Sequence, residues 1–324
     1  MLQGDAMVEP RLKVGLMLPQ IDGMRQRGIT RWIDLKVMAQ LAEDVGFDSL
    51  WLVDHFLYQL LGEDRGRGAW ECWTLLSALA ATTRKVELGT LVLGIGFRNP
   101  ALLAKMVDTA DEVSNGRLIL GLSAGYHELE YRAFGYPYDH RVSRFAEAIQ
   151  IVHGLLRHGH VDFAGEYYQA RDCELRPRGP RLNGPPIMIG SIRPRMLELT
   201  ARYADSWNAY YDDTRNSVET LRRLREVVDG ACRGAGREPA TLERTVTVLA
   251  ADADGDSWWN RLPTPHGELA LKPLSGSPAQ MAAELRAYAR EGITHIQMCV
   301  DPTTPQTIEA FARVLESLRQ AERA

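Results

Sequence analysis

The chain has 324 residues, of which 45% are hydrophobic and 25% charged, as is typical of a folded globular protein. Its net charge of −4 argues against nucleic acid as a partner, because no general basic field is present. No run of about 18 apolar residues occurs, so a membrane-spanning helix is not expected.

The cysteines and the N-terminus indicate a cytoplasmic protein. Cys72, Cys173, Cys232 and Cys299 lie far apart and form no C-x-x-C pair, which fits a reducing compartment and argues against a zinc site. Residues 1–10 contain two carboxylates and no apolar run, so a signal peptide is not predicted. The histidines are scattered without an H-E-x-x-H pattern, and we expect no metal site.

Short apolar segments alternate with amphipathic segments along the whole chain. The predicted strands are residues 13–18, 49–53, 86–92, 118–122, 187–189, 206–208, 245–249 and 293–300. The predicted helices are residues 32–45, 71–83, 99–114, 143–156, 194–203, 217–233, 277–291 and 306–318. Some helices carry clear start signals, such as Asn99-Pro100 and the capping box from Ser277 to Gln280.

Eight strands that alternate with eight helices predict an α/β protein, a (β/α)₈ TIM barrel with insertion segments. An open doubly wound sheet is the alternative, although no G-x-G-x-x-G follows the first strand. We expect one domain over residues 1–324. Within it, residues 1–10 are predicted to be a disordered tail, residues 157–185 a hairpin insertion and residues 251–277 a variable loop.

In such a barrel, the active site lies at the C-terminal ends of the strands. His55 follows the second strand and is the best acid/base candidate, because an imidazole titrates near neutrality. Asp54 could orient this imidazole or tune its pKa. The alternative is that Asp54 caps the loop and His55 is simply packed there.

The loop after residues 118–122 is the most informative part of the sequence. It contains small and polar residues that let a ligand approach the backbone, namely Ser123, Ala124, Gly125, Tyr126 and His127. His127 and the following Glu128 either contact a ligand or hydrogen-bond within the loop.

A second group of small residues follows the fifth predicted strand. Gly190 and Ser191 could cradle a phosphate at the start of the next helix, and Arg193 adds positive charge. Taken alone, this is a weak signal.

Taken together, these segments resemble the bacterial luciferase-like superfamily of flavin- and deazaflavin-dependent oxidoreductases. The resemblance covers nearly the whole chain and rests on the segments 14–19, 42–51 with Asp54-His55, 86–90, 98–100, 116–135, 186–190 and 204–208. It implies a barrel that holds FMN or coenzyme F420 at its C-terminal mouth.

The resemblance also implies roles for individual residues. A non-proline cis peptide bond near Thr90-Leu91 would back the cofactor ring, the residues from Ser123 to His127 would line the cofactor, and its phosphate would lie near Gly190-Ser191. His55 aligns with a histidine that serves as acid or base in several F420 enzymes.

Within the superfamily, the pattern G-x-x-A-G-aromatic-x-E-x-E-Y-x-A-F-G is most similar to F420-dependent members. Two positions depart from some of these enzymes: Gln59 stands where they carry Trp, and Ala124 where they carry a catalytic carboxylate. The sugar-phosphate or alcohol chemistry of those enzymes is therefore not carried over to this chain.

Three functions remain open. The first is an F420-dependent oxidoreductase that moves a hydride to or from a small organic substrate, with His55 handling the proton and Arg193 near the anionic cofactor tail. The second is an FMN-dependent monooxygenase that uses O₂ and a separate flavin reductase. The third is a non-catalytic barrel that binds a flavin. Family members are often dimers, so a homodimer is possible.

Overall fold

The computed structural model describes residues 11–23, 29–59, 65–251 and 271–322. The predicted tail at residues 1–10 and most of the predicted variable loop lie outside these residues. Eight parallel strands form a closed ring: β1 (Lys13–Met17), β2 (Ser49–Leu52), β5 (Glu87–Thr90), β7 (Leu118–Ser123), β10 (Ile187–Gly190), β11 (Ser206–Ala209), β12 (Glu243–Ala251) and β13 (His295–Asp301).

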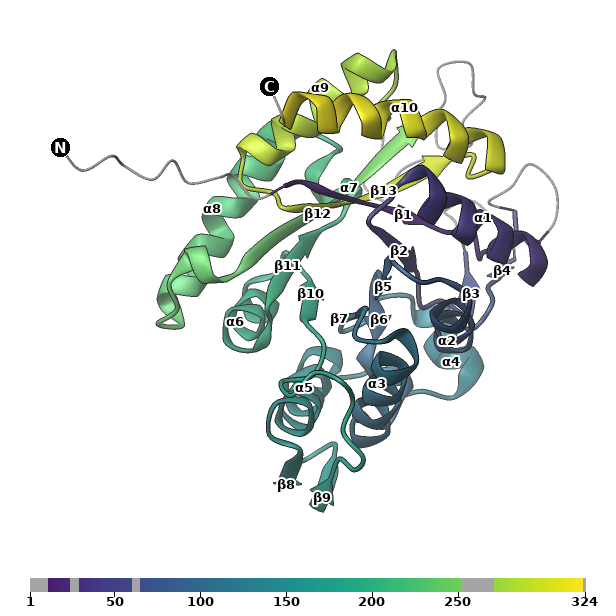
Figure 1. Cartoon of the computed structure of the whole chain (residues 1–324). Coiled ribbons are helices and arrows are strands. Elements are labelled where there is room, and N and C mark those ends of the chain that lie inside the picture. Colours follow the sequence, from purple (N-terminus) through teal and green to yellow (C-terminus); the bar gives the residue numbers. More distant parts are fainter. Residues whose placement is uncertain (1–10, 24–28, 60–64, 252–270, 323–324) are drawn as a thin grey trace.

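The ring follows chain order, and β13 pairs with β1 to close it, with Lys13 opposite His295. This closure confirms the barrel and excludes the open sheet. The helices that cover the barrel are α1 (Trp32–Val45), α2 (Cys72–Thr82), α3 (Pro100–Ser114), α5 (Arg141–His158), α6 (Pro194–Tyr203), α8 (Val218–Gly234), α9 (Pro278–Arg290) and α10 (Pro305–Glu322). Figure 1 shows them around the central strands.

Short elements lie between these repeats. They are β3 (Leu57–Tyr58), β4 (Arg67–Gly68), β6 (Leu93–Gly94), η1 (Ile95–Phe97), α4 (Glu128–Phe134), β8 (His160–Ala164), β9 (Gln169–Glu174), α7 (Tyr211–Thr214) and η2 (Pro239–Thr241). β8 and β9 form an antiparallel hairpin beyond α5, at the lower edge of Figure 1. Helix α4 replaces part of the loop predicted after residues 118–122. Its first turn carries two carboxylates, which favour a helix N-terminus.

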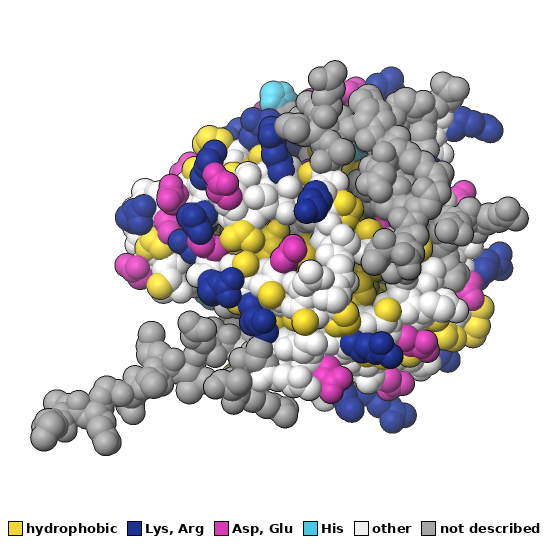
Figure 2. All heavy atoms as spheres, turned by 90° about the horizontal axis from the view of Figure 1, so that it is seen from above, with side chains coloured by type: hydrophobic (Ala, Val, Ile, Leu, Met, Phe, Trp, Pro, Cys, Tyr) yellow, Lys and Arg dark blue, Asp and Glu magenta, His cyan; other side chains and the backbone are white. Residues whose placement is uncertain are grey.

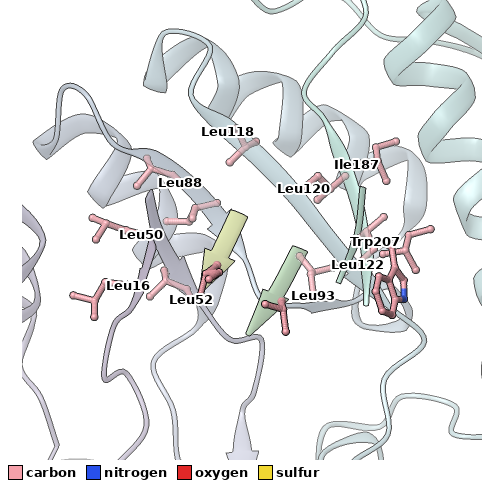
Figure 3. Packing of buried hydrophobic residues seen from close by; sticks show 14 of the residues in the cluster. Leu16, Leu50, Leu52, Leu88, Leu93, Leu118, Leu120, Leu122, Ile187 and Trp207 are labelled. Atoms are coloured by element: carbon pink, nitrogen blue, oxygen red, sulfur yellow. The ribbon is translucent and has the colours of Figure 1, made fainter. Parts of the chain in front are cut away.

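Alternate residues of each strand face opposite sides, which divides the core in two. One set packs between the strands and the helices, and Figure 3 shows part of it, including Leu16, Leu50, Leu88, Leu120 and Trp207. The other set points into the barrel and forms a separate apolar cluster: Met17, Trp51, Ile119, Met188, Leu249 and Cys299 from the strands, with Ile21, Val53, Leu91 and Tyr211 from the segments that follow them.

Trp51 fills the amino-terminal part of the barrel interior. Its Nε1–H donates to Ser49 Oγ at 2.7 Å, and this oxygen lies 2.7 Å from His295 Nε2. The absence of a side chain at Gly89 provides the space for this indole, because a Cβ atom there would lie 2.2 Å from the ring. Side chains therefore fill the barrel interior at this end.

The outer surface carries both signs of charge. Figure 2 shows one face, where Lys and Arg side chains are interspersed with Asp and Glu around hydrophobic residues. Among the helices of the described residues, none has the length and apolar character needed to cross a bilayer.

Candidate active site

His55 and Glu130 form a hydrogen-bonded pair at the carboxyl end of the barrel. His55 Nδ1 lies 2.7 Å from Glu130 Oε1, and the carboxylate side chain is 1% exposed. Because an ionised carboxylate can only accept, Nδ1 carries the proton in this bond. No partner of His55 Nε2 is found within the described residues, so this nitrogen is the one available to a ligand.

The second oxygen of Glu130 holds the chain that follows His55. Glu130 Oε2 accepts from the backbone N–H of Phe56 at 2.5 Å and of Leu57 at 3.2 Å. The same carboxylate therefore fixes the imidazole and the backbone that carries it. Both contacts join residues more than 70 positions apart in the sequence.

Local packing explains why α4 places Glu130 here. The Tyr131 hydroxyl donates to the Ala124 carbonyl at 3.0 Å, which ties the helix back to the end of β7. Gly125 has φ +73°, and a Cβ atom there would lie 2.0 Å from the Tyr131 hydroxyl. On the other side, the Phe56 ring lies 4.6 Å from that of Phe134 and 4.8 Å from that of Phe97.

Aromatic rings surround His55. The centroid of Tyr58 lies at 4.8 Å, that of Tyr126 at 5.8 Å and that of His127 at 6.1 Å. Tyr58 also packs on the apolar cluster inside the barrel, and burial raises its pKa. Tyr126 is 62% exposed, so it borders the site rather than filling the interior.

His127 accepts a hydrogen bond and does not act as a second His55. The backbone N–H of Gln59 donates to His127 Nε2 at 3.1 Å, so this nitrogen is unprotonated. Burial lowers the pKa of His127, Glu130 acts in the opposite direction, and His55 lowers it further. Among the described residues, the His127 ring therefore hydrogen-bonds to the segment after β2 and not within its own loop, and the alternative of ligand contact stays a prediction.

The Asp54 carboxylate is held by Arg98 and Gly94 and is not the hydrogen-bond partner of the His55 ring. Its oxygens accept from Arg98 Nη1 at 2.8 Å and Nη2 at 3.0 Å, and from the N–H of Gly94 at 3.1 Å. Burial raises the pKa of Asp54 and Arg98 opposes that shift. The carboxylate that orients the imidazole is Glu130. The sequence offered one signal for it, since Glu130 is a fixed position of the motif that carries the resemblance.

The strand β5 changes direction after Thr90. The Thr90 hydroxyl donates to the Gly121 carbonyl at 2.7 Å and accepts from the Gly121 N–H at 2.9 Å, in place of a backbone ladder. A non-proline cis peptide bond then joins Leu91 and Val92. This is the bond that the resemblance implied near Thr90-Leu91. The Thr90 side chain is buried, and its hydroxyl is used in both bonds to Gly121. Leu91 belongs to the apolar cluster inside the barrel.

Two of the other predicted site residues lie beside this bond or the residues after it: Gly190 lies against Val92, and Ser123 pairs with Gly94 between β7 and β6. A Cβ atom added to Gly190 would lie 3.2 Å from Val92, so the end of β10 meets the cis step. Ser123 Oγ accepts from the N–H of Gly125 at 3.2 Å, which shapes the turn between β7 and α4.

Ser191 and Arg193 lie further along, at the start of α6. The Ser191 hydroxyl is 3.1 Å from Thr200 Oγ1, and its carbonyl accepts from Trp207 Nε1. Among the described residues, no side-chain hydrogen bond caps the N-terminus of α6. Arg193 is exposed and forms no ion pair with the described residues. In the described part of the chain, neither residue hydrogen-bonds to His55 or Glu130.

The sequence profile of the luciferase-like monooxygenase family matches residues 13–261. The chain is 34% identical over 182 residues to F420-dependent glucose-6-phosphate dehydrogenase from Amycolatopsis mediterranei, which is 54% of this chain and 52% of the relative. It is 30% identical over 245 residues to pyrimidine monooxygenase RutA from Variovorax paradoxus, which is 74% of this chain and 63% of the relative.

A third relative is 5,10-methylenetetrahydromethanopterin reductase from Archaeoglobus fulgidus, 30% identical over 54% of this chain and 48% of the relative. The matches thus span about half to two thirds of these relatives' lengths. Among solved structures, an F420-dependent secondary alcohol dehydrogenase in complex with an F420-acetone adduct is similar with a TM-score of 0.79 and 21% identity, over 95% of this chain and 99% of that one. At this identity, the structural similarity supports the fold alone.

Proposed function

The chain belongs to the luciferase-like monooxygenase family, and on this basis we propose that it is an F420-dependent oxidoreductase acting on a small organic substrate. The observation that carries the proposal is the His55–Glu130 pair at the carboxyl end of the barrel. His55 follows β2, Glu130 lies on α4 after β7, and the Leu91–Val92 cis bond follows β5, the strand that pairs with both β2 and β7.

The pair can move a proton at one defined atom. With Nδ1 committed to Glu130, His55 donates or accepts through Nε2, and the buried carboxylate stabilises the imidazolium that forms. When bound, F420 supplies or accepts a hydride at C5 of its ring. A substrate that gains or loses a hydride at carbon and a proton at oxygen or nitrogen needs both functions.

The chain also offers groups that fit the phosphate of such a cofactor. Within the described residues, the first turn of α6 has no side-chain cap, and the positive end of the helix favours an anion. Gly190 brings the backbone close to Val92, and Arg193 adds an exposed guanidinium. We therefore assign Gly190, Ser191 and Arg193 to the phosphate, and Leu91 and the loop from Ser123 to His127 to the ring.

A second candidate is a monooxygenase that uses O₂ and reduced FMN from a separate reductase. The similarity to pyrimidine monooxygenase RutA favours it. F420 stands first because enzymes named as F420-dependent recur among the relatives, including a glucose-6-phosphate dehydrogenase and a hydroxymycolic acid dehydrogenase.

Cofactor titration separates the two candidates. The purified protein is titrated with F420 and with FMN, and the quenching of cofactor fluorescence gives both dissociation constants. We expect F420 to bind more tightly. A preference for FMN, with O₂ consumption on addition of reduced FMN, would favour the monooxygenase instead.

The proton role is tested with His55→Ala and a matched control, His153→Ala. His153 lies on α5 against Tyr203, outside the barrel. We expect His55→Ala to retain F420 binding but to lower turnover about 10²- to 10⁴-fold with any substrate found by screening. His153→Ala should keep both. Unchanged turnover in His55→Ala would reject the assignment.

A further inference from the structure

Arg98 links three segments that meet near the candidate site. Its Nη1 and Nη2 hold the Asp54 carboxylate in a two-pronged ion pair, and Nη2 lies 2.5 Å from Glu71 Oε1. Both partners of the Asp54 pair are buried, with side chains 10% and 0% exposed. Neither acid/base chemistry nor cofactor phosphate binding, as proposed above, uses this pair.

The first of these segments carries His55, which directly follows Asp54. The second is β6, where the Gly94 N–H donates to the same carboxylate, two residues after Val92. The third is the start of α2, where Glu71 accepts from the N–H groups of Trp73 and Thr74. The Asp54 carboxylate, which Arg98 holds, thus connects the residue before His55 to the backbone that follows the cis bond.

Removal of the guanidinium would affect this connection strongly. A carboxylate without exposure to water needs charged or hydrogen-bonding partners, and Asp54 would otherwise take up a proton or draw in water. Burial already raises its pKa and Arg98 is the main opposing influence. The planar fork also fixes the direction of the carboxylate, which a lysine ammonium cannot do.

We propose that Arg98 is a positioning residue that holds His55 and the Leu91–Val92 step in a fixed spacing. The inference rests on the proposed function, in which His55 moves the proton and the cis step backs the cofactor ring. Arg98 acts through Asp54, whose carboxylate also accepts from the Gly94 N–H. Misplacement of a reacting group by about 1 Å can cost about 10²-fold in rate.

The test compares Arg98→Met and Arg98→Lys with Arg181→Met. Arg181 makes a similar fork to the buried Asp111, with 2.9 Å from Nε and 2.5 Å from Nη2, but joins α3 to the segment after β9. Each variant is measured for its melting midpoint, for the ¹⁵N signals of the His55 ring without cofactor, and for F420 affinity by fluorescence quenching. His55→Gln assigns the ring signals.

We expect both methionine variants to melt at lower temperature. Of these two variants, Arg98→Met alone should shift the His55 signals towards those of a free imidazole. It should also weaken F420 binding about tenfold and lower turnover about 10²-fold. Arg98→Lys should give values between those of Arg98→Met and the wild type. If Arg98→Met does not fold, Arg98→Lys is compared with Arg181→Met instead.

The proposal would be overturned if Arg98→Met had the same His55 signals and F420 affinity as the wild type. It would also be overturned if Arg181→Met changed both as much as Arg98→Met does. If the wild-type protein does not bind F420, the proposed function fails by itself. The ring signals then still decide whether Arg98 positions His55.

Discussion

Two histidines at opposite ends of the same barrel, one partly buried and one fully buried, differ in their partners and in their exposure. His55, at the carboxyl end, is paired with the Glu130 carboxylate and keeps one ring nitrogen without a partner in the described residues. His295, at the amino end, is paired with the Ser49 hydroxyl beside the Trp51 ring and is 4% exposed.

The contrast shows that the partner and the burial determine what a histidine can do. Burial and the nearby Lys13 lower the pKa of His295 to about 3, so it stays neutral and acts as a structural hydrogen-bonding group. A carboxylate partner stabilises the protonated form of an imidazole, whereas a hydroxyl does not. We therefore expect changes near His55 to alter catalysis, and changes near His295 to alter stability.

The largest expected effect comes from Glu130→Gln. The amide oxygen can keep the hydrogen bonds to Phe56 and Leu57, but the amide N–H₂ then faces His55 Nδ1 and forces the ring proton onto Nε2. We expect turnover at neutral pH to fall about 10²- to 10⁴-fold while the melting midpoint changes little. Glu128→Gln, an exposed carboxylate on the same helix, is the control and should keep full activity.

The next effect is the pH dependence of stability that His295 causes at the amino end of the barrel. The ordinary histidine pKa is 6.5, and that of His295 in the folded protein is about 3. Between these values the unfolded chain binds a proton that the folded protein does not, so the free energy of unfolding falls as the pH falls. At pH 4.5 this site should cost about 2–3 kcal/mol relative to pH 7.5.

Urea unfolding at both pH values checks this prediction. The variant His295→Gln can still hydrogen-bond to Ser49 and does not titrate, so its loss of stability between pH 7.5 and pH 4.5 should be smaller by that amount. All other titrating groups are common to the two proteins. Parallel losses in both would contradict the burial of a neutral His295.

The smallest effect tests the packing around Trp51. In Gly89→Ala, the new methyl group would lie 2.2 Å from the indole, which is enclosed and cannot move aside. We expect the free energy of unfolding to fall by about 1–3 kcal/mol in urea. Gly230→Ala, on α8 with no heavy atom within 4 Å of the new Cβ, should instead leave stability unchanged or raise it slightly. Equal effects of the two substitutions would show that the interior has room.

The sequence predicted the fold because its main signals are local. Strand and helix periods, capping residues such as Asn99, and the order of the segments all lie within short stretches of chain, and eight repeats favour a closed ring over an open sheet. Helix α4 escaped prediction, since its seven residues show no full apolar period and its Phe134 and Tyr131 rings pack on Phe56 and Phe97 from other segments.

The sequence by itself also selected His55 and a cis bond near Thr90-Leu91, through strand ends and family resemblance. Only the tertiary structure assigned the carboxylates, because adjacency in the chain suggested Asp54 as the partner of His55. Successive side chains at the end of a strand point to opposite sides, so Asp54 turns to Arg98 while His55 meets Glu130 from another repeat. Which charged groups meet is decided by the closure of the barrel, and no local pattern encodes it.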